Sequence, residues 1–167
     1  MDRQEINALS PQEREAFHRD AEARIQTFSY SRPPDIPRPK QIESVCRGEY
    51  FRLLVQVVKD GGENNLHYHT NSESAWMVLK GRARFYGVGD RLLGDFGPQE
   101  GVFLPGGSRY RFEKVGEEVL EILQMVAGDT AASRQGQKAE RVNIDAHKDW
   151  MGKDANLTVY ADSGAAE

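Results

Sequence analysis

The strongest constraint on the fold is a series of short apolar runs separated by glycine-containing turns between residues 50 and 128. The run 50–58 is rich in β-branched and aromatic residues, which favour strands. Further strands are predicted over 75–79, 82–86, 101–104, 110–114 and 119–127. Many short strands at this spacing indicate a sandwich or barrel rather than a parallel sheet with crossover helices.

The amino-terminal region is predicted to contain a helix followed by an extended arm. Ser10 is a typical N-cap, Pro11 suits the first helical position, and Glu13 completes a capping box. A narrow apolar stripe with a spacing of four residues ends at Ile25, so we expect a helix that lies on the barrel or on a partner subunit. Four prolines within 33–39 then predict an extended arm over the body.

Composition limits the classes of partner. The 167 residues are 38% hydrophobic and 29% charged, which predicts one globular domain with additional segments. A net charge of -4 gives no reason to expect nucleic acid as a partner. No apolar run approaches the ~18 residues of a membrane span, and the first residues lack the apolar core of a signal peptide. A single cysteine, Cys46, fits a reducing compartment, so we expect a cytoplasmic protein.

Two of the four histidines, His67 and His69, lie one residue apart. In a strand, alternate side chains share a face, so these two imidazoles would lie about 7 Å apart along the backbone on one face. That spacing suits a shared metal ion. A buried, hydrogen-bonded histidine pair is the alternative.

The segment around the histidines resembles the first motif of the cupins. Five residues separate Gly61 from His67, His69 follows, and Gly81 closes the segment. The centre of the second cupin motif is matched by the segment 105–110, in the right order along the chain. The resemblance extends from about residue 42 to residue 127.

This resemblance implies an all-β fold, a double-stranded β-helix or jelly-roll barrel, with an amino-terminal helix and extended terminal segments. Together with the segments that flank it in the sequence, this predicts a helix and proline-rich arm over 1–40, a barrel over 41–128 and a tail that docks on the barrel over 129–167. Cupins commonly pair through barrel faces and exchange amino-terminal segments, so the resemblance also implies a homodimer.

Two positions depart from the cupin motifs. Counting back from Gly81 places Ser74 where the metal-binding glutamate is usual, whereas counting forward from His69 reaches Glu73. Since a shift of one residue turns a strand side chain to the opposite face, Glu73 would reach a metal only through a loop or bulge. A solvent-exposed turn residue is the alternative for Glu73. The second departure is Tyr110, which replaces the histidine of the second motif.

Three functions remain open at this point. The preferred hypothesis is a metal-dependent enzyme resembling non-haem iron oxygenases, in which His67, His69 and Glu73 hold Fe, Mn, Ni or Zn and Tyr110 orients a small organic substrate. The second is a metal-free isomerase, cyclase or dehydratase, with His67 or His69 as base and Tyr110 as acid. The third is a non-catalytic barrel that binds a small molecule.

Four further residues are candidates for substrate binding. Trp76 shares the inward parity of Ser74, so it is expected to form a wall of the cavity, although core packing would explain it equally well. Arg52 and Gln56 share one face of the first predicted strand. A guanidinium there would bind a substrate carboxylate through two parallel hydrogen bonds.

Overall fold

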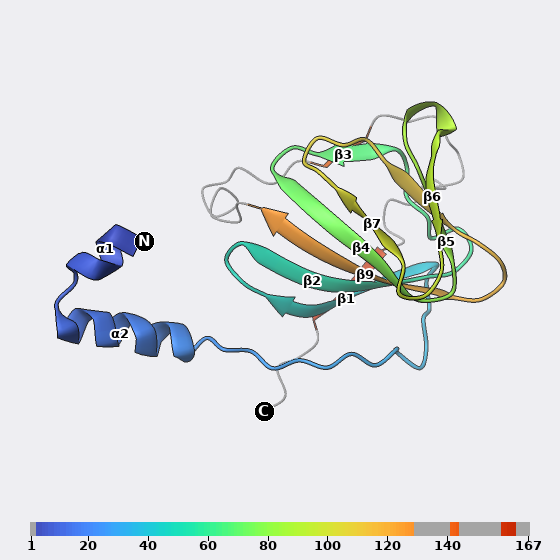
Figure 1. Cartoon of the computed structure of the whole chain (residues 1–167). Coiled ribbons are helices and arrows are strands. Elements are labelled where there is room, and N and C mark those ends of the chain that lie inside the picture. The colour runs from blue at the N-terminus through green and yellow to red at the C-terminus, as the bar shows by residue number, and fades with distance from the viewer. Residues whose placement is uncertain (1–2, 129–140, 144–157, 163–167) are drawn as a thin grey trace.

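The computed structural model describes residues 3–128, 141–143 and 158–162, and it consists mainly of antiparallel strands (Figure 1). Two helices precede the strands, α1 (Arg3–Ala8) and α2 (Pro11–Glu22). The strands are β1 (Lys40–Arg47), β2 (Phe51–Val58), β3 (His67–His69), β4 (Ser72–Lys80), β5 (Ala83–Tyr86), β6 (Leu92–Phe96), β7 (Gly101–Leu104), β8 (Arg111–Lys114), β9 (Leu120–Gly128), β10 (Arg141–Asn143) and β11 (Thr158–Asp162). A 3-10 turn, η1 (Val88–Asp90), joins β5 to β6.

The strands form two facing layers. One is a six-stranded sheet in the order β11-β1-β2-β9-β4-β7, in which β11 alone runs parallel to its neighbour. The other layer contains the sheets β6-β5-β8 and β10-β3, which an isolated bridge between His67 and Tyr110 links. Both layers contribute alternate side chains to the interior that they enclose.

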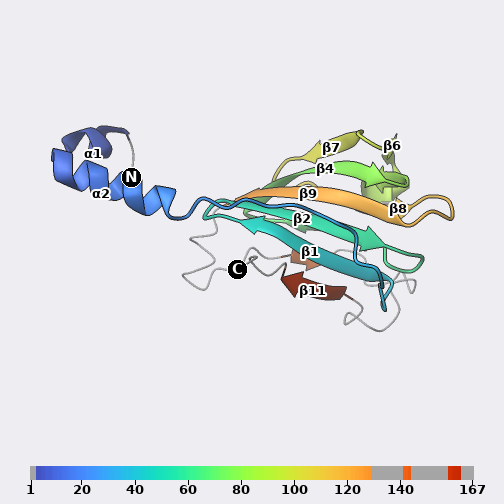
Figure 2. The same ribbon diagram turned by 90° about the horizontal axis from the view of Figure 1, so that it is seen from below.

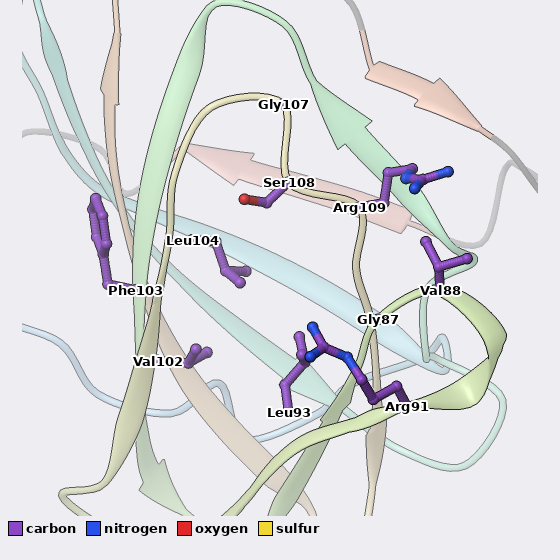
Figure 3. A pocket seen from close by; sticks show the side chains of 10 residues that line it. All are labelled: Gly87, Val88, Arg91, Leu93, Val102, Phe103, Leu104, Gly107, Ser108 and Arg109. Carbon is purple, nitrogen blue, oxygen red and sulfur yellow. The ribbon is translucent and has the colours of Figure 1, made fainter.

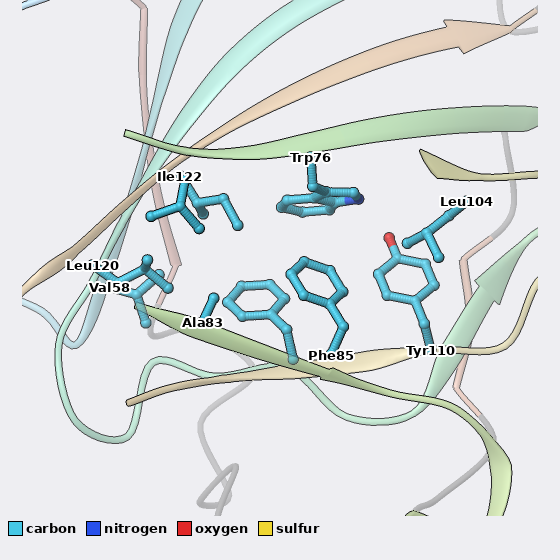
Figure 4. Close-up of a cluster of buried hydrophobic side chains, with 10 residues drawn as sticks. Val58, Trp76, Ala83, Phe85, Leu104, Tyr110, Leu120 and Ile122 are labelled. Carbon is cyan, nitrogen blue, oxygen red and sulfur yellow. The ribbon is translucent and has the colours of Figure 1, made fainter. Parts of the chain in front are cut away.

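Aromatic side chains fill part of this interior. Trp76 projects from β4 toward Phe85 and Tyr110 of the facing layer (Figure 4). Its ring centroid lies 5.8 Å from that of Phe85 and 5.4 Å from that of Phe112. Aliphatic residues of β2, β9 and β7 surround the rings, and all of these side chains are buried. This cluster holds the two layers together, because aromatic rings bury the largest apolar areas.

The segment between α2 and β1 covers the outer face of the large sheet, as the proline-rich sequence predicted (Figure 2). Ile36 packs on Val55 and Val57, the outward-facing residues of β2. Tyr30 donates a hydrogen bond of 2.8 Å to the buried carboxylate of Glu121 on β9. Burial and this hydrogen bond raise the pKa of Tyr30 above its ordinary value. The arm thus shields a sheet face that would otherwise be exposed.

The structure confirms the Ser10 capping box but corrects the predicted extent and position of the helix. Ser10 and Glu13 form both reciprocal hydrogen bonds of the box. α2 ends at Glu22 rather than near Ile25, and none of its residues is buried. The expectation that the helix lies on the barrel is therefore wrong, since it projects away from the strands (Figure 1). Contact with a partner subunit remains a prediction.

The start of β7 lies very close to β4. An added Cβ at Gly101 would sit 1.8 Å from the carbonyl oxygen of Trp76. Only glycine allows this approach of two strands.

Within the described residues, no helix has the length and apolar character needed to cross a membrane.

Candidate functional site

The candidate site lies where β3 faces the start of β8. His67 and Tyr110 exchange two backbone hydrogen bonds, of 3.0 Å and 2.9 Å. Residues paired in this way lie directly opposite each other, so their side chains project on the same side. His69 joins them because it is two residues from His67 in the same strand. Asn64 fixes the preceding loop by accepting a hydrogen bond of 2.8 Å from the backbone N–H of Phe112.

The three side chains form a compact aromatic group. The ring centroid of His67 lies 5.1 Å from that of His69 and 4.5 Å from that of Tyr110. The centroids of His69 and Tyr110 are 6.5 Å apart. His67 is 3% exposed and Tyr110 is 2% exposed, whereas His69 is partly buried. The predicted placement of both histidines on one face is correct, and Tyr110 lies beside them.

The tautomer of neutral His67 follows from its neighbour. The Nδ1 atom of His67 lies 2.7 Å from the carbonyl oxygen of Asn65. Since a carbonyl oxygen only accepts hydrogen bonds, Nδ1 must carry the proton. In the neutral ring Nε2 is therefore the acceptor nitrogen. An acceptor nitrogen is what both a general base and a metal ligand require.

Glu73 does not join this group. Its side chain is exposed, and its neighbour Ser74 faces the interior and is buried. β4 is regular here, with Glu73 paired to Ala127 and Ser74 paired to Val126, so no bulge turns the carboxylate inward. Within the described residues, no three His, Cys, Asp or Glu side chains are grouped to hold a metal ion. The predicted ligand set of two histidines and Glu73 is thus wrong, and the donors present do not fit a two-histidine, one-carboxylate metal face.

Trp76 and Ser74 face the interior, as their parity predicted. The indole N–H of Trp76 donates a hydrogen bond of 3.0 Å to the hydroxyl of Ser74. The Trp76 ring lies 6.1 Å from that of Tyr110, and its remaining contacts are with core rings. Most of the indole is therefore part of the core, while its polar edge faces Ser74.

Gln56 belongs to a buried polar pair that sequence reasoning identified only in part. Gln56 is 6% exposed, and its Nε2 donates a hydrogen bond of 2.8 Å to Oε1 of Gln124 on β9. Gln124 is the cross-strand partner of Trp76, which places the amide pair beside the aromatic group. Arg52 lies on the same face of β2 by alternation and is partly buried. Gln124 was missed, although a polar residue between the inward Ile122 and Val126 was a usable signal.

The amide pair leaves one buried acceptor unused. The Oε1 atom of Gln56 has no hydrogen-bond partner within the described residues. Leaving a buried acceptor unsatisfied costs about 1–3 kcal/mol. Such a group in the interior, bonded to the cross-strand partner of Trp76, is suited to a ligand that carries a hydrogen-bond donor.

The layers and this polar, aromatic interior define a double-stranded β-helix barrel. Its particular fold is that of the cupins. The structure is similar to an RmlC-like cupin family protein of Methanocaldococcus jannaschii, with a TM-score of 0.53 and 15% identity over 66% of this chain and 97% of that one. It is also similar to an RmlC-like cupin protein of Desulfovibrio desulfuricans, with a TM-score of 0.52 and 21% identity over 61% of this chain and 97% of that one. These likenesses confirm the predicted all-β cupin barrel.

The sequence is also similar to part of a much longer curated protein. The chain is 27% identical over 109 residues to mannose-1-phosphate guanylyltransferase 2 of Escherichia coli O157:H7, and the match covers 62% of this chain and 21% of that protein. The chain thus spans about a fifth of the length of the curated relative it matches. No model of a known protein family matches the sequence.

Proposed function

We propose that the chain is a cupin-type enzyme that transfers a proton within a small organic molecule, with a histidine as base and Tyr110 as acid. The observation that carries the proposal is the buried packing of Tyr110 against His67, with ring centroids 4.5 Å apart. The carboxylate expected to complete a metal face lies on the other side of β4. The preference between the two enzymatic hypotheses is therefore reversed, and proton transfer becomes the first.

The reaction follows from what the two groups can exchange. Nε2 of His67 accepts a proton from a carbon next to a carbonyl group, and the electron pair of that C–H bond forms a carbon–carbon double bond. The phenol of Tyr110 gives its proton to the carbonyl oxygen, which yields a neutral enol. The protonated His67 then gives its proton to the former carbonyl carbon, and the phenolate of Tyr110 takes a proton from the hydroxyl on the neighbouring carbon, which becomes the new carbonyl. This completes an isomerisation and restores both groups. His69, which is partly buried, exchanges protons between this group and solvent.

The amide pair indicates the kind of substrate. Oε1 of Gln56 accepts hydrogen bonds, so a substrate hydroxyl would satisfy it. Arg52 on the same face would bind a carboxylate of a substrate that carries one. A hydroxylated carbonyl compound, such as a sugar or a hydroxy acid, meets these requirements. The similarity to a mannose-1-phosphate guanylyltransferase supports a sugar-like substrate.

Deuterium exchange tests the proposal, because it detects proton transfer whatever product is formed. A panel of hydroxy ketones, aldoses and hydroxylated keto acids is incubated with the protein in D2O, and loss of the α-proton signal is followed by proton NMR. We expect at least one compound to exchange and Tyr110→Phe to slow that exchange by about 100-fold or more. Tyr86→Phe is the matched control, because the Tyr86 hydroxyl contacts Glu113 away from the site.

Exchange by Tyr110→Phe at the wild-type rate would remove Tyr110 as the acid. Binding of a compound without exchange would place the chain among non-catalytic small-molecule barrels. Absence of both binding and exchange across the panel would overturn the proposed substrate class.

A metal-dependent oxygenase is the second candidate, favoured by the two imidazoles on one face. A divalent transition metal would have His67 and His69 as its protein ligands. Elemental analysis after reconstitution with Fe, Mn, Ni or Zn tests this function. Stoichiometric metal that is lost in His67→Gln/His69→Gln would favour it over proton transfer, whereas equal low metal in both proteins would reject it.

A further inference from the structure

The arginines between residues 82 and 111 fall into two groups. Three of them are ion-paired with carboxylates. Arg82 and Arg84 both contact Asp95, at 2.6 Å and 2.8 Å, and Arg111 contacts Asp90 at 2.9 Å and Glu113 at 3.3 Å. The other two are Arg91 and Arg109, and neither has an ion pair or side-chain hydrogen bond with any described residue.

Arg91 and Arg109 line the same cleft, which has a volume of about 600 Å³ (Figure 3). The cleft lies between β6 and β7, each an end strand of its sheet among the described residues, and the loops before β6 and after β7 form its rim. Figure 3 shows the Arg91 side chain extending over Leu93, with the hydroxyl of Ser108 on the opposite side of the cleft. The cleft thus has cationic groups at its rim.

The floor of the cleft is apolar. Leu93, Val102 and Leu104 line it and also pack on the aromatic core. Leu104 is buried in the same cluster as Tyr110, but none of His67, His69 and Tyr110 lines the cleft. The cleft is therefore distinct from the interior site described above.

Among the described residues, no carboxylate lines the cleft to neutralise its arginines. Asp90 is next to Arg91 in sequence, but its carboxylate contacts Nε and Nη2 of Arg111, at 3.1 Å and 2.9 Å. The chain as a whole is acidic, with a net charge of -4, so two arginines in a cleft without carboxylates are a local exception.

We propose that this cleft binds a small organic carboxylate with an apolar body. A guanidinium binds a carboxylate through parallel hydrogen bonds, so Arg91, whose side chain extends over Leu93, is the main anion-binding group (Figure 3). Arg109 adds a second positive charge at the rim. The aliphatic floor would cover the apolar part of the ligand, as is usual in small-molecule sites. Inorganic phosphate has no apolar part, so it would contact only the arginines at the rim and not the aliphatic floor.

Titration with benzoate, benzamide and inorganic phosphate tests the proposal on the full-length protein. Binding is followed by calorimetry and by the methyl NMR signals of Leu93, Val102 and Leu104. We expect benzoate to shift these signals and benzamide, its neutral analogue, to bind at least tenfold more weakly. Arg91→Gln should weaken benzoate binding by about tenfold, which is ~1.4 kcal/mol, and Arg91→Gln/Arg109→Gln should weaken it further.

Arg19→Gln is the matched control, because it removes the same charge from the exposed surface of α2. It should bind benzoate like the wild type, and circular dichroism should show all variants folded. Equal benzoate affinity in the double variant and the wild type would overturn the proposal, as would equal affinities for benzamide and benzoate. Phosphate that binds as tightly as benzoate would overturn the organic ligand class.

The outcome is separable from the proposed enzymatic function. Tyr110→Phe and His69→Gln should retain benzoate binding in the cleft even where proton transfer is lost. If Tyr110→Phe abolished benzoate binding while Arg91→Gln did not, benzoate would occupy the barrel interior and the cleft proposal would fail.

Discussion

Gln56 and Gln124 form a buried amide pair with one unused acceptor, which suggests that the pair lowers the stability of the fold and serves ligand binding instead. Replacing both by leucine removes the unsatisfied group and the hydrogen bond together, and such double replacements are often neutral or stabilising. We expect Gln56→Leu/Gln124→Leu to leave the free energy of unfolding unchanged or raise it by about 1–3 kcal/mol, while substrate binding is lost. Chemical denaturation and ligand titration measure the two effects.

Gln56→Leu alone is the informative comparison, because it removes the donor to Gln124 and leaves Oε1 of Gln124 without its present partner. It should be less stable than the double variant. A double variant that is the least stable of the three proteins would show that the amide pair serves the fold rather than a ligand.

Asp95 is the residue whose titration should be visible in the stability of the barrel. Its hydrogen bond with Arg84, together with that from Arg82, lowers the pKa of the Asp95 carboxyl. A carboxyl with a lowered pKa in the folded state stabilises the protein above its unfolded-state pKa, and this contribution is lost as pH falls through the folded-state value. Asp95→Asn should therefore melt at a lower temperature than the wild type near neutral pH.

The difference in melting temperature between wild type and Asp95→Asn should shrink as the solution is acidified through the titration of Asp95. Thermal melts at several pH values in the acidic range measure it. A difference that stays constant with pH would mean that Asp95 acts through packing rather than through its charge.

At the scale of single residues, the alternation of side chains along a strand decided which sequence predictions were correct. The inward parity of Ser74 and Trp76 was readable because β4 is regular, and the same regularity places Glu73 outside. The side-chain partners of Gln56 and Asp95 were not readable, because they lie on other strands whose register the sequence does not give. The tautomer of His67 depends on a carbonyl in the preceding loop, which no side-chain motif records.

Among the elements, β7 depends on the absence of a side chain at Gly101. An added Cβ would meet the Trp76 carbonyl oxygen at 1.8 Å and its carbon at 2.8 Å, both of them backbone atoms that cannot rotate away. Gly101→Ala should separate β7 from β4 and cost about 1–3 kcal/mol of unfolding free energy. Because Val102 and Leu104 of β7 line the cleft, its affinity for benzoate should also fall.

Gly48→Ala is a suitable control for this effect, because a Cβ there would meet only one atom at an ordinary distance of 3.7 Å. Chemical denaturation should show little change for Gly48→Ala. Equal stability of the two alanine variants would contradict the close approach of β4 and β7.

Apolar content determined which elements were predictable. β2, β4 and β9 carry long β-branched or aromatic runs and were predicted within a few residues. β1 and β6 were missed. β1 is rich in polar residues, and the buried Gln41 and partly buried Glu43 on its outward face bond to each other. β6 contains a glycine and an aspartate, which interrupt its apolar pattern.

At the scale of the whole molecule, the exposed apolar residues that follow α2 favour the homodimer implied by the cupin resemblance. Ile25 is 74% exposed and Phe28 is 57% exposed, and large apolar side chains are usually covered by a partner when they gather outside the core. We expect a dimer at micromolar concentration by analytical ultracentrifugation, and Ile25→Ser/Phe28→Ser should shift it toward monomer.

Leu92→Ser removes an exposed apolar side chain from β6 and serves as the control. It should sediment like the wild type. A wild-type protein that sediments as a monomer would contradict the expected dimer, and so would a serine double variant that stays fully dimeric.

The cupin barrel as a whole could be predicted because the spacing of glycines and histidines is local along the chain. The position of α2 could not, since its narrow apolar stripe indicated a contact without identifying the surface that provides it. The cleft between β6 and β7 could not be predicted from the sequence either, because Arg91 and Arg109 line one cleft only when the two layers are in place.

The detachment of α1 and α2 from the strands has a practical consequence (Figure 1). A fluorophore on a cysteine introduced at an exposed position of α2 would leave the barrel interior and the cleft unperturbed. Energy transfer between labelled copies would then report subunit exchange in real time, in the same samples used to follow ligand binding. The amino-terminal helices thus offer a position where a fluorescent label can be attached.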